Sequence, residues 1–325
     1  MIETLASGQS SLVWSRGRRT EWQSVGALAR RTEVNPAPVV DRIRATSEPV
    51  DAIVTGVRGE QRRIIAVPTI GPDGLVHAVS LRITSPDDDP ATDPAPRLGA
   101  MTFDPSTYTI AQTADSYMMT SNSPDPAACV RKPGVFLRKV FAFDAVAELT
   151  DHCLNPAGRP MFRGTLGIKH DNGSLLSFHG VSRFDASTGR VRGFAHDITD
   201  HEPLALNPET LLNISPAATS NSATVLIGFP ADEQFAPVPS YWVTPRPAAL
   251  HDVDHAGPNR VHPDDVPKLL RVQQLLAGAA DSNASLCLQV RIHGRDGWVL
   301  CSLQCARWPG ANINSAILMC QLTTT

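Results

Sequence analysis

The sequence predicts an α+β protein of three modules, each an antiparallel sheet flanked by helices. Three observations support this prediction. Short segments of alternating apolar and polar residues recur along the chain, turns rich in glycine and asparagine join them, and short helical segments lie between them. A length of 325 residues suits two to three domains, because one domain usually has ~100–200 residues.

Two stretches of low hydrophobicity divide the chain. Residues 87–97 consist mainly of aspartate, proline and alanine, and such a segment cannot bury itself, which is typical of a linker. A second stretch, near 201–222, mixes one short apolar run with Pro, Asn and Ser. We therefore expect modules at 1–86, 98–202 and 203–325, with the linker at 87–97.

The second and third modules contain a repeat. The motif Ser116-Tyr117-x-x-Thr120 returns as Ser240-Tyr241-x-x-Thr244, at an offset of 124 residues, and Gly173 returns as Gly297 at the same offset. Two short motifs at one spacing, within a similar order of elements, indicate two copies of one unit.

A hairpin in the third module follows from alternation. Segments 285–293 and 298–306 flank the turn at Arg295-Asp296, and a two-residue loop opposes apolar residues throughout. The pairs are Leu286 with Cys305, Leu288 with Leu303, Val290 with Cys301, and Ile292 with Val299. Cys301 and Cys305 should therefore be buried, while Cys287 should lie on the other face. We expect a helix over 264–276 that begins at Asp264 as N-cap, and a last strand over 314–322.

The equivalent hairpin in the second module has two registers. A three-residue Asp-Asn-Gly loop between 162–170 and 174–184 pairs Leu166 with Phe178, whereas a two-residue loop brings His179 to the apolar face. We favour the first register because it opposes more apolar pairs. A helix over 143–152 precedes this hairpin, and a strand over 191–198 follows it.

The first module has helices at 22–31 and 36–45 and strands at 50–57, 62–69 and 75–83. Residues 25–45 could also form a helix-turn-helix of a transcriptional regulator, but Glu33 occupies the turn position where glycine is usual. We favour two helices that cover a sheet over DNA binding. The arginines that would face phosphate are Arg16, Arg18, Arg19, Arg30 and Arg31.

Several motifs resemble sensory domains. The run His262-Pro263-Asp264-Asp265, followed by a helix, a hairpin and a strand, resembles the second half of a PAS domain, and 193–200 (GFAHDITD) resembles the Asp-Ile-Thr ending of many PAS domains. Residues 66–79 are similar to the sheet of a GAF domain. The whole chain resembles actinobacterial PAS/GAF proteins without an output domain, which implies a GAF-like module followed by two PAS-like modules. One departure is Ala142-Phe143-Asp144, which stands where the second module should repeat His-Pro-Asp-Asp.

This resemblance implies that a small apolar ligand is held between sheet and helices. It also implies an unidentified protein partner in signalling, and a homodimer formed through the outside of a sheet, where Trp298 and Leu300 lie beside Cys287. No haem, flavin or bilin attachment motif accompanies it. The candidate pocket residues are Tyr117, Phe178, Tyr241, Cys301 and Cys305.

Composition and motifs argue against other classes of protein. The net charge of −3 argues against a protein held mainly by nucleic-acid phosphates. We find no nucleotide, metalloprotease or serine-hydrolase motif, and therefore expect no enzyme. His251 and His255 have ligand spacing, but we expect them to be solvated loop residues rather than metal ligands. Without a membrane span or secretory signal, the expected location is the cytoplasm.

Overall fold

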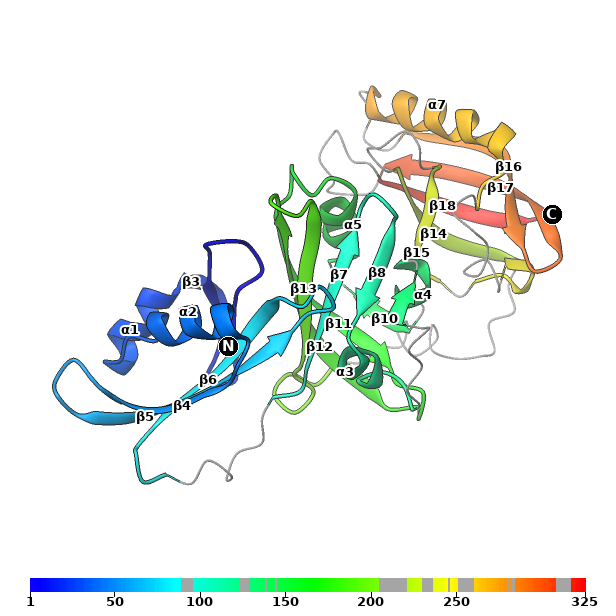
Figure 1. Cartoon of the computed structure of the whole chain (residues 1–325). Coiled ribbons are helices and arrows are strands. Elements are labelled where there is room, and N and C mark those ends of the chain that lie inside the picture. Colours follow the sequence, from blue (N-terminus) through cyan, green and yellow to red (C-terminus); the bar gives the residue numbers. More distant parts are fainter. Residues whose placement is uncertain are drawn as a thin grey trace. The chain divides into compact units, whose positions relative to one another are not determined.

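The computed structural model describes 265 of the 325 residues and divides them into two compact units (Figure 1). Unit 1 comprises Met1–Val130 and Pro160–Leu204, and unit 2 comprises Arg131–Arg159 and Ala205–Thr325. Most of the 87–97 linker, His251 and His255 lie outside the described residues. These are 1–88, 96–122, 129–131, 133–137, 139–143, 145–204, 221–229, 236–244, 246–250, 260–279, 281, 284–307 and 317–325.

The predicted α+β class is wrong. Strands make up 48% of the described residues and helices only 21%, in three antiparallel sheets. The reason is that many strands were not predicted, among them β7 (Leu98–Asp104) and β14 (Ser222–Gly228). At the N-terminus, Trp22 belongs to a strand, and the first helix begins only at Val25. Among the described residues, helices are few and short, and the longest has 12 residues. In this part of the chain, no helix is long and apolar enough to cross a membrane.

The first sheet has the strand order β3-β2-β1-β6-β5-β4. Helices α1 (Val25–Thr32) and α2 (Ala37–Thr46) cover one face, where Leu28 and Ile43 join a core with Ile64 and Val79. The three predicted strands and the second helix are confirmed to within two residues, whereas β1–β3 were not predicted. The strands are β1 (Ile2–Glu3), β2 (Ser11–Ser15), β3 (Arg18–Ser24), β4 (Val50–Thr55), β5 (Gln61–Ile70) and β6 (Val76–Thr84).

Within unit 1, the second sheet has the order β11-β12-β13-β7-β8. Leu166 pairs with Phe178, which confirms the three-residue loop, and Gly173 takes a φ of 90° in that loop, where glycine is favoured. The strands are β7 (Leu98–Asp104), β8 (Thr109–Gln112), β11 (Met161–Lys169), β12 (Leu175–Asp185) and β13 (Arg190–Asp197).

The third sheet has the order β15-β14-β18-β17-β16. All four predicted pairs of its hairpin are confirmed. Helix α7 (Val266–Ala277) covers the apolar face, but Asp264 is not its N-cap: the ring of His262 accepts from Asp264 N and caps a 3₁₀ turn, and Asp265 precedes the helix. The strands are β14 (Ser222–Gly228), β15 (Val238–Trp242), β16 (Ser285–Gly294), β17 (Gly297–Arg307) and β18 (Ile317–Thr324).

The second and third sheets follow one plan. The second sheet has seven strands, and five of them, β7, β8, β11, β12 and β13, have the order 2-1-5-4-3, as do the five strands of the third sheet. In addition, β7 and β14 begin 124 residues apart, as do β11 and β16. This shared plan supports the repeat inferred from the sequence. The remaining elements are α3 (Ala114–Met118), β9 (Val130–Arg131), α4 (Pro133–Leu137), β10 (Val140–Phe143), α5 (Val146–Leu154), η3 (Ala248–Leu250) and η5 (Pro263–Asp265).

Candidate functional site

The five predicted pocket residues do not form one site. Tyr117, on α3, and Phe178, on β12, belong to unit 1, whereas Tyr241, on β15, belongs to unit 2 with the two cysteines. Cys301 and Cys305 are buried in the core under α7, as the alternation predicts. Burial raises the pKa of the Cys301 thiol to about 12, so this thiol is protonated and inert at neutral pH.

A more distinctive feature of unit 1 is the outer face of its second sheet, opposite the face that carries Leu166 and Phe178. Seven neighbouring side chains of this face on β12 and β13 are buried, although five of them are polar. At the centre, Val181 and Phe194 pack against Leu5, Val13 and Ala78 of the first sheet. The first two sheets therefore meet in a joint, defined here by its second-sheet residues His179, Val181, Arg183, Asp185, Arg192, Phe194 and His196.

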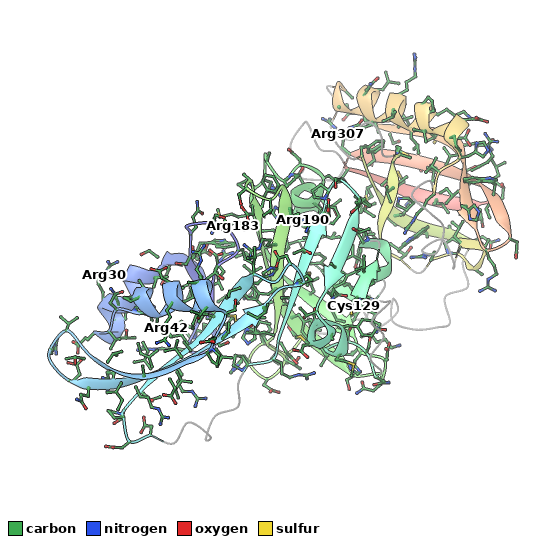
Figure 2. All side chains as sticks on the ribbon, viewed as in Figure 1. Arg30, Arg42, Cys129, Arg183, Arg190 and Arg307 are labelled. Atoms are coloured by element: carbon green, nitrogen blue, oxygen red, sulfur yellow. The ribbon has the colours of Figure 1, made fainter. Side chains whose placement is uncertain are left out.

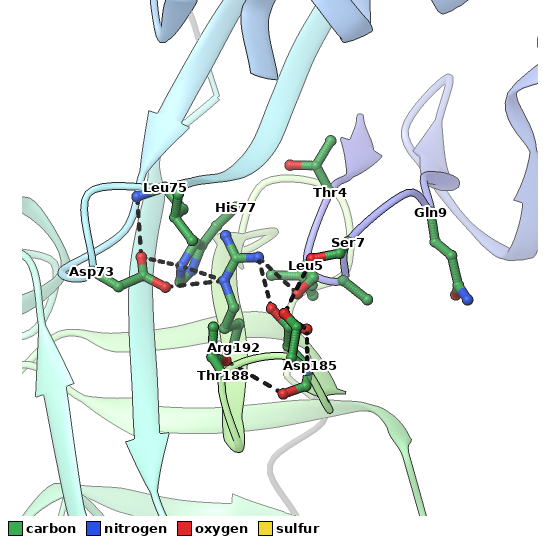
Figure 3. A network of polar contacts seen from close by, with 12 residues as sticks. Thr4, Leu5, Ser7, Gln9, Asp73, Leu75, His77, Asp185, Thr188 and Arg192 are labelled. Atoms are coloured by element: carbon green, nitrogen blue, oxygen red, sulfur yellow. Dashed lines mark hydrogen bonds and ion pairs between the residues drawn. The ribbon is translucent and has the colours of Figure 1, made fainter. Parts of the chain in front are cut away.

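Arg192 organises one end of the joint (Figure 3). Its Nε lies 3.0 Å from Asp73 Oδ2, and its two terminal nitrogens donate to the carbonyl oxygens of Leu5 and Val76 at 2.9 and 3.2 Å. Asp185 Oδ2 lies 3.7 Å from Arg192 Nη1, while the other oxygen accepts from Ser187. A buried guanidinium is thus surrounded by acceptors, as the cost of burying a charge requires.

Asp73 and His77 connect the turn before β6 to this arginine. His77 Nδ1 donates to Gly193 O at 2.9 Å, and its Nε2 lies 2.9 Å from Asp73 Oδ1. Burial alone would raise the pKa of Asp73, but the hydrogen bond with His77 and the charges of His77 and Arg192 hold it at about 2. Asp73 is therefore a carboxylate at neutral pH and pairs with Arg192.

Arg183 makes a second buried ion pair beside the first. Its Nη2 lies 2.8 Å from Glu3 Oε1, and its Nη1 donates to Gln9 Oε1 at 2.8 Å. The guanidinium also lies over the ring of Trp22, 4.7 Å from its centroid. Because β12, β13 and the first sheet all contribute charged groups to these ion pairs, this end fixes how the two sheets are placed against each other.

The other end of the joint contains histidines. His179 and His196 are cross-strand partners, and both rings lie against Trp14, with centroid distances of 5.8 and 4.8 Å. Neither ring nitrogen of His179 has a hydrogen-bond partner in the structure. Among the described residues, no group of three or more His, Cys, Asp or Glu is arranged to hold a metal ion.

The equivalent face of the third sheet is open along β16 and β17, whereas Leu226 and Tyr241 on β14 and β15 are buried. Trp298 and Leu300 are 43% and 42% exposed, and Cys287 beside them is exposed too. Arg291 is paired with Asp265, at 2.8 Å from Nε to Oδ2. The hydrogen bonds that Asp265 accepts from Arg291 and Lys268 outweigh the effect of burial and hold the pKa of Asp265 well below its usual range. The rings of His262 and His293 flank Trp298.

Sequence reasoning missed the joint entirely. Polar residues at alternate positions of a strand, such as Arg183 and Asp185, ordinarily indicate a face in water. One usable signal was the composition of that face, because two arginines and two histidines stand on two adjacent strands.

The helix-turn-helix segment lies on the first sheet instead of standing apart. Val25, Leu28, Val40 and Ile43 point into the core of that sheet. Glu33 ends α1 with a φ of 59°. Arg30 and Arg42 are exposed on α1 and α2 (Figure 2), as expected for helices that cover a sheet.

Comparison with known proteins shows similarity of fold. Residues 1–92 match the family model described as "Rv3651-like, N-terminal". The crystal structure of an uncharacterized protein from Mycobacterium tuberculosis is similar over 99% of this chain and 94% of that one, with 16% identity and a TM-score of 0.69. At that identity, the similarity concerns the fold alone.

Two further structures are only weakly similar. A sensory box histidine kinase/response regulator from Burkholderia thailandensis E264 has 13% identity, a TM-score of 0.25 and coverage of 32% of this chain and 79% of that one. An RNA-binding light-oxygen-voltage receptor has 9% identity, a TM-score of 0.26 and coverage of 70% and 95%. No curated protein matches the chain.

Proposed function

We propose that this chain is a non-enzymatic signalling or scaffold protein of the cytoplasm that associates through the outer face of its third sheet. One observation carries the proposal: of two sheets that share one plan, one has this face covered, whereas the other leaves it open along β16 and β17. In the second sheet, another sheet of the same chain covers that face. In the third sheet, Trp298 and Leu300 are left to a molecule from outside the chain.

The occupant we propose for this face is a second copy of the chain. Tryptophan and large apolar side chains are the usual anchors of protein interfaces. Among the described residues of β16, β17 and β18, Arg291 is the one outward-facing Lys, Arg, Asp or Glu, and Asp265 neutralises it. Two copies of this face can therefore meet without repulsion between like charges.

A sensory role is the finer part of the proposal. Its support is the resemblance of residues 262–265 and 193–200 to PAS motifs and of residues 66–79 to GAF domains. In that role a small apolar ligand would bind between sheet and helices, near Tyr117 and Phe178 in unit 1 or Tyr241 and Cys301 in unit 2. The ligand would favour one packing of helix on sheet and so change the exposed surface.

Sedimentation of the full chain over a hundredfold range of concentration tests the association. We expect a concentration-dependent dimer, and we expect Trp298→Glu to weaken it roughly tenfold or more, because the charge would be buried at the centre of the contact. The matched control is Leu275→Glu, on α7, whose side chain is 53% exposed but lies on the helix covering the opposite side of the sheet.

Two results would contradict this proposal. One is a chain that stays monomeric at every concentration. The other is a dimer that Trp298→Glu and Leu275→Glu weaken equally, since that outcome would place the contact elsewhere.

A further inference from the structure

Among the described residues, no hydrogen-bond acceptor at the histidine end of the joint is placed to stabilise a protonated ring of His179. His179 and His196 are only 1% and 3% exposed, and they face the first sheet from neighbouring strands. The ring of Trp14 covers both, edge-on to His196. No partner within hydrogen-bonding distance reaches Nδ1 or Nε2 of His179, or Nδ1 of His196, from the residues the structure describes. An imidazolium here would leave N–H donors buried without acceptors, which is costly.

The charged groups around the pair add to this cost. Arg19 on β3 and Arg163 on β11 face His179. The amino group of Met1 lies near His196, and burial lowers the pKa of that amino group from 8.0 to about 5, so it is neutral in the closed joint at neutral pH. The charge of Asp197 favours a protonated His196, whereas the charges of Arg19 and Arg163 disfavour a protonated His179.

The rim of this end consists of ion pairs between the two sheets. Arg19 Nη2 lies 2.6 Å from Glu202 Oε2, and Arg163 pairs with Glu21. These side chains are partly or largely exposed, so each pair adds little to the closed joint. The contacts that would resist opening at this end are mainly the packing of Trp14 on the two rings.

We propose that the joint between the first and second sheets is acid-sensitive and opens at its histidine end when His179 and His196 take up protons. Opening would give both rings water as a hydrogen-bond partner and would separate them from Arg19 and Arg163. At the Arg192 end, the pKa of Asp73 is held at about 2, so Asp73 stays ionised and paired with Arg192 over the same pH range. That end therefore acts as the hinge side of the movement.

The size of the effect follows from linkage. Burial lowers the pKa of His179 to about 3 and that of His196 to about 4, from 6.5 in water. The open state binds more protons, so the closed state is favoured above about pH 6.5 and is progressively lost as the pH falls below it. Between about pH 7.5 and about pH 5.5, each histidine shifts the equilibrium about tenfold towards opening, and the two together about 100-fold. The buried amino group of Met1, with its pKa lowered from 8.0 to about 5, shifts the equilibrium further in the same direction.

Thiol labelling of a Val181→Cys variant measures the opening. Val181 is buried at the centre of the joint, and the native Cys287 is exposed. At a protein concentration below that of association, Cys287 serves as an internal reference, and its rate corrects for the pH dependence of the thiol reaction. We expect the labelling rate at position 181, relative to Cys287, to rise at least about 100-fold from about pH 7.5 to about pH 5.5.

Variants assign the effect to the two rings. Adding either His179→Phe or His196→Phe should lower the rise about tenfold, and adding both should lower it about 100-fold, leaving only the part that the amino group of Met1 contributes. His170→Phe is the matched control, because His170 lies at the β11–β12 turn outside the joint, and it should leave the rise unchanged. A relative rate that does not change with pH, or a full rise that survives the double substitution, would overturn the proposal.

A second measurement needs no substitution in the joint. The ring protons of His179 and His196 in the native full chain can be followed by NMR during an acid titration. We expect neither ring to titrate near pH 6.5 while the joint is closed. A normal titration of either ring in the closed protein would remove the basis of the proposal.

Discussion

The second and third sheets of this chain have one strand order, yet their outer faces differ in chemistry. At equivalent positions, the second sheet carries Val181 opposite Arg163, and the third carries Gln304 opposite Cys287. The first face is buried and contains charges that find partners on the first sheet, whereas the second face is exposed along β16 and β17 and nearly uncharged there. The comparison shows that a buried sheet face need not be apolar, provided that its charges are paired.

The difference also separates two kinds of contact. A buried ion pair that is pulled apart costs much stability, because a charge that loses its partner stays desolvated. They therefore suit a permanent joint within one chain. An apolar patch around Trp298 carries no such penalty when it is uncovered, which suits a contact that forms and separates.

The largest loss of stability should come from removing the buried charge of Arg192 on the covered face of the second sheet. Arg192→Met removes the partner of Asp73 and Asp185, and we expect a loss of about 3–5 kcal/mol in the free energy of unfolding. Urea-induced unfolding of the full chain at neutral pH measures it. Since the pKa of Asp73 is held at about 2, this network stabilises the fold above about pH 3.8 and loses its contribution as the pH falls towards 2.

Arg190→Met is the matched control on the same strand. Arg190 pairs with Asp104 at 3.2 Å, and its side chain is nearly half exposed, so its loss should cost only about 0–1 kcal/mol. Equal losses in the two variants would show that the Arg192 network contributes no more than a surface ion pair.

A smaller effect distinguishes the two faces of the third sheet. Cys301→Ser puts a hydroxyl into the apolar core, where the nearest acceptor is Val299 O, 3.6 Å from the present sulfur, and should cost about 1–3 kcal/mol. Cys287→Ser lies on the open face and should be close to neutral. Thermal unfolding of the two variants measures the contrast, and a larger loss for Cys287→Ser would mean that a partner already covers the open face.

Local pattern was enough to predict the hairpins. The register of β16 on β17 follows from one wholly apolar face, because a slip by one residue would expose Leu288 and Val290 together. The three-residue loop that ends at Gly173 could be predicted in the same way, from the pairing of apolar residues on either side of it. Such features depend on residues close in sequence, and the structure has them as expected.

Long-range contacts and weak strands could not be predicted in this way. The joint brings Asp73 and Arg192 together across more than one hundred residues, and no local pattern records that pairing. The strands β2 and β3 are short, and β3 is largely polar and lies at a sheet edge, so periodicity gave no signal for them. Strands missed in this way, together with others such as β7 and β14, led to the wrong α+β class.

The smallest effect should come from a charge placed on the open face. Gln304→Lys adds a side chain that water can reach, so we expect a change within about 0.5 kcal/mol in the unfolding free energy of the dilute protein. At the equivalent position of the covered face, Val181→Lys buries an unpaired ammonium beside Phe194 and should be severely destabilising. Urea unfolding of both variants, at a concentration below that of association, compares the faces directly. If Gln304→Lys proved as damaging as Val181→Lys, the third sheet would already be covered within the chain, and the contrast between the two sheets would not exist in solution.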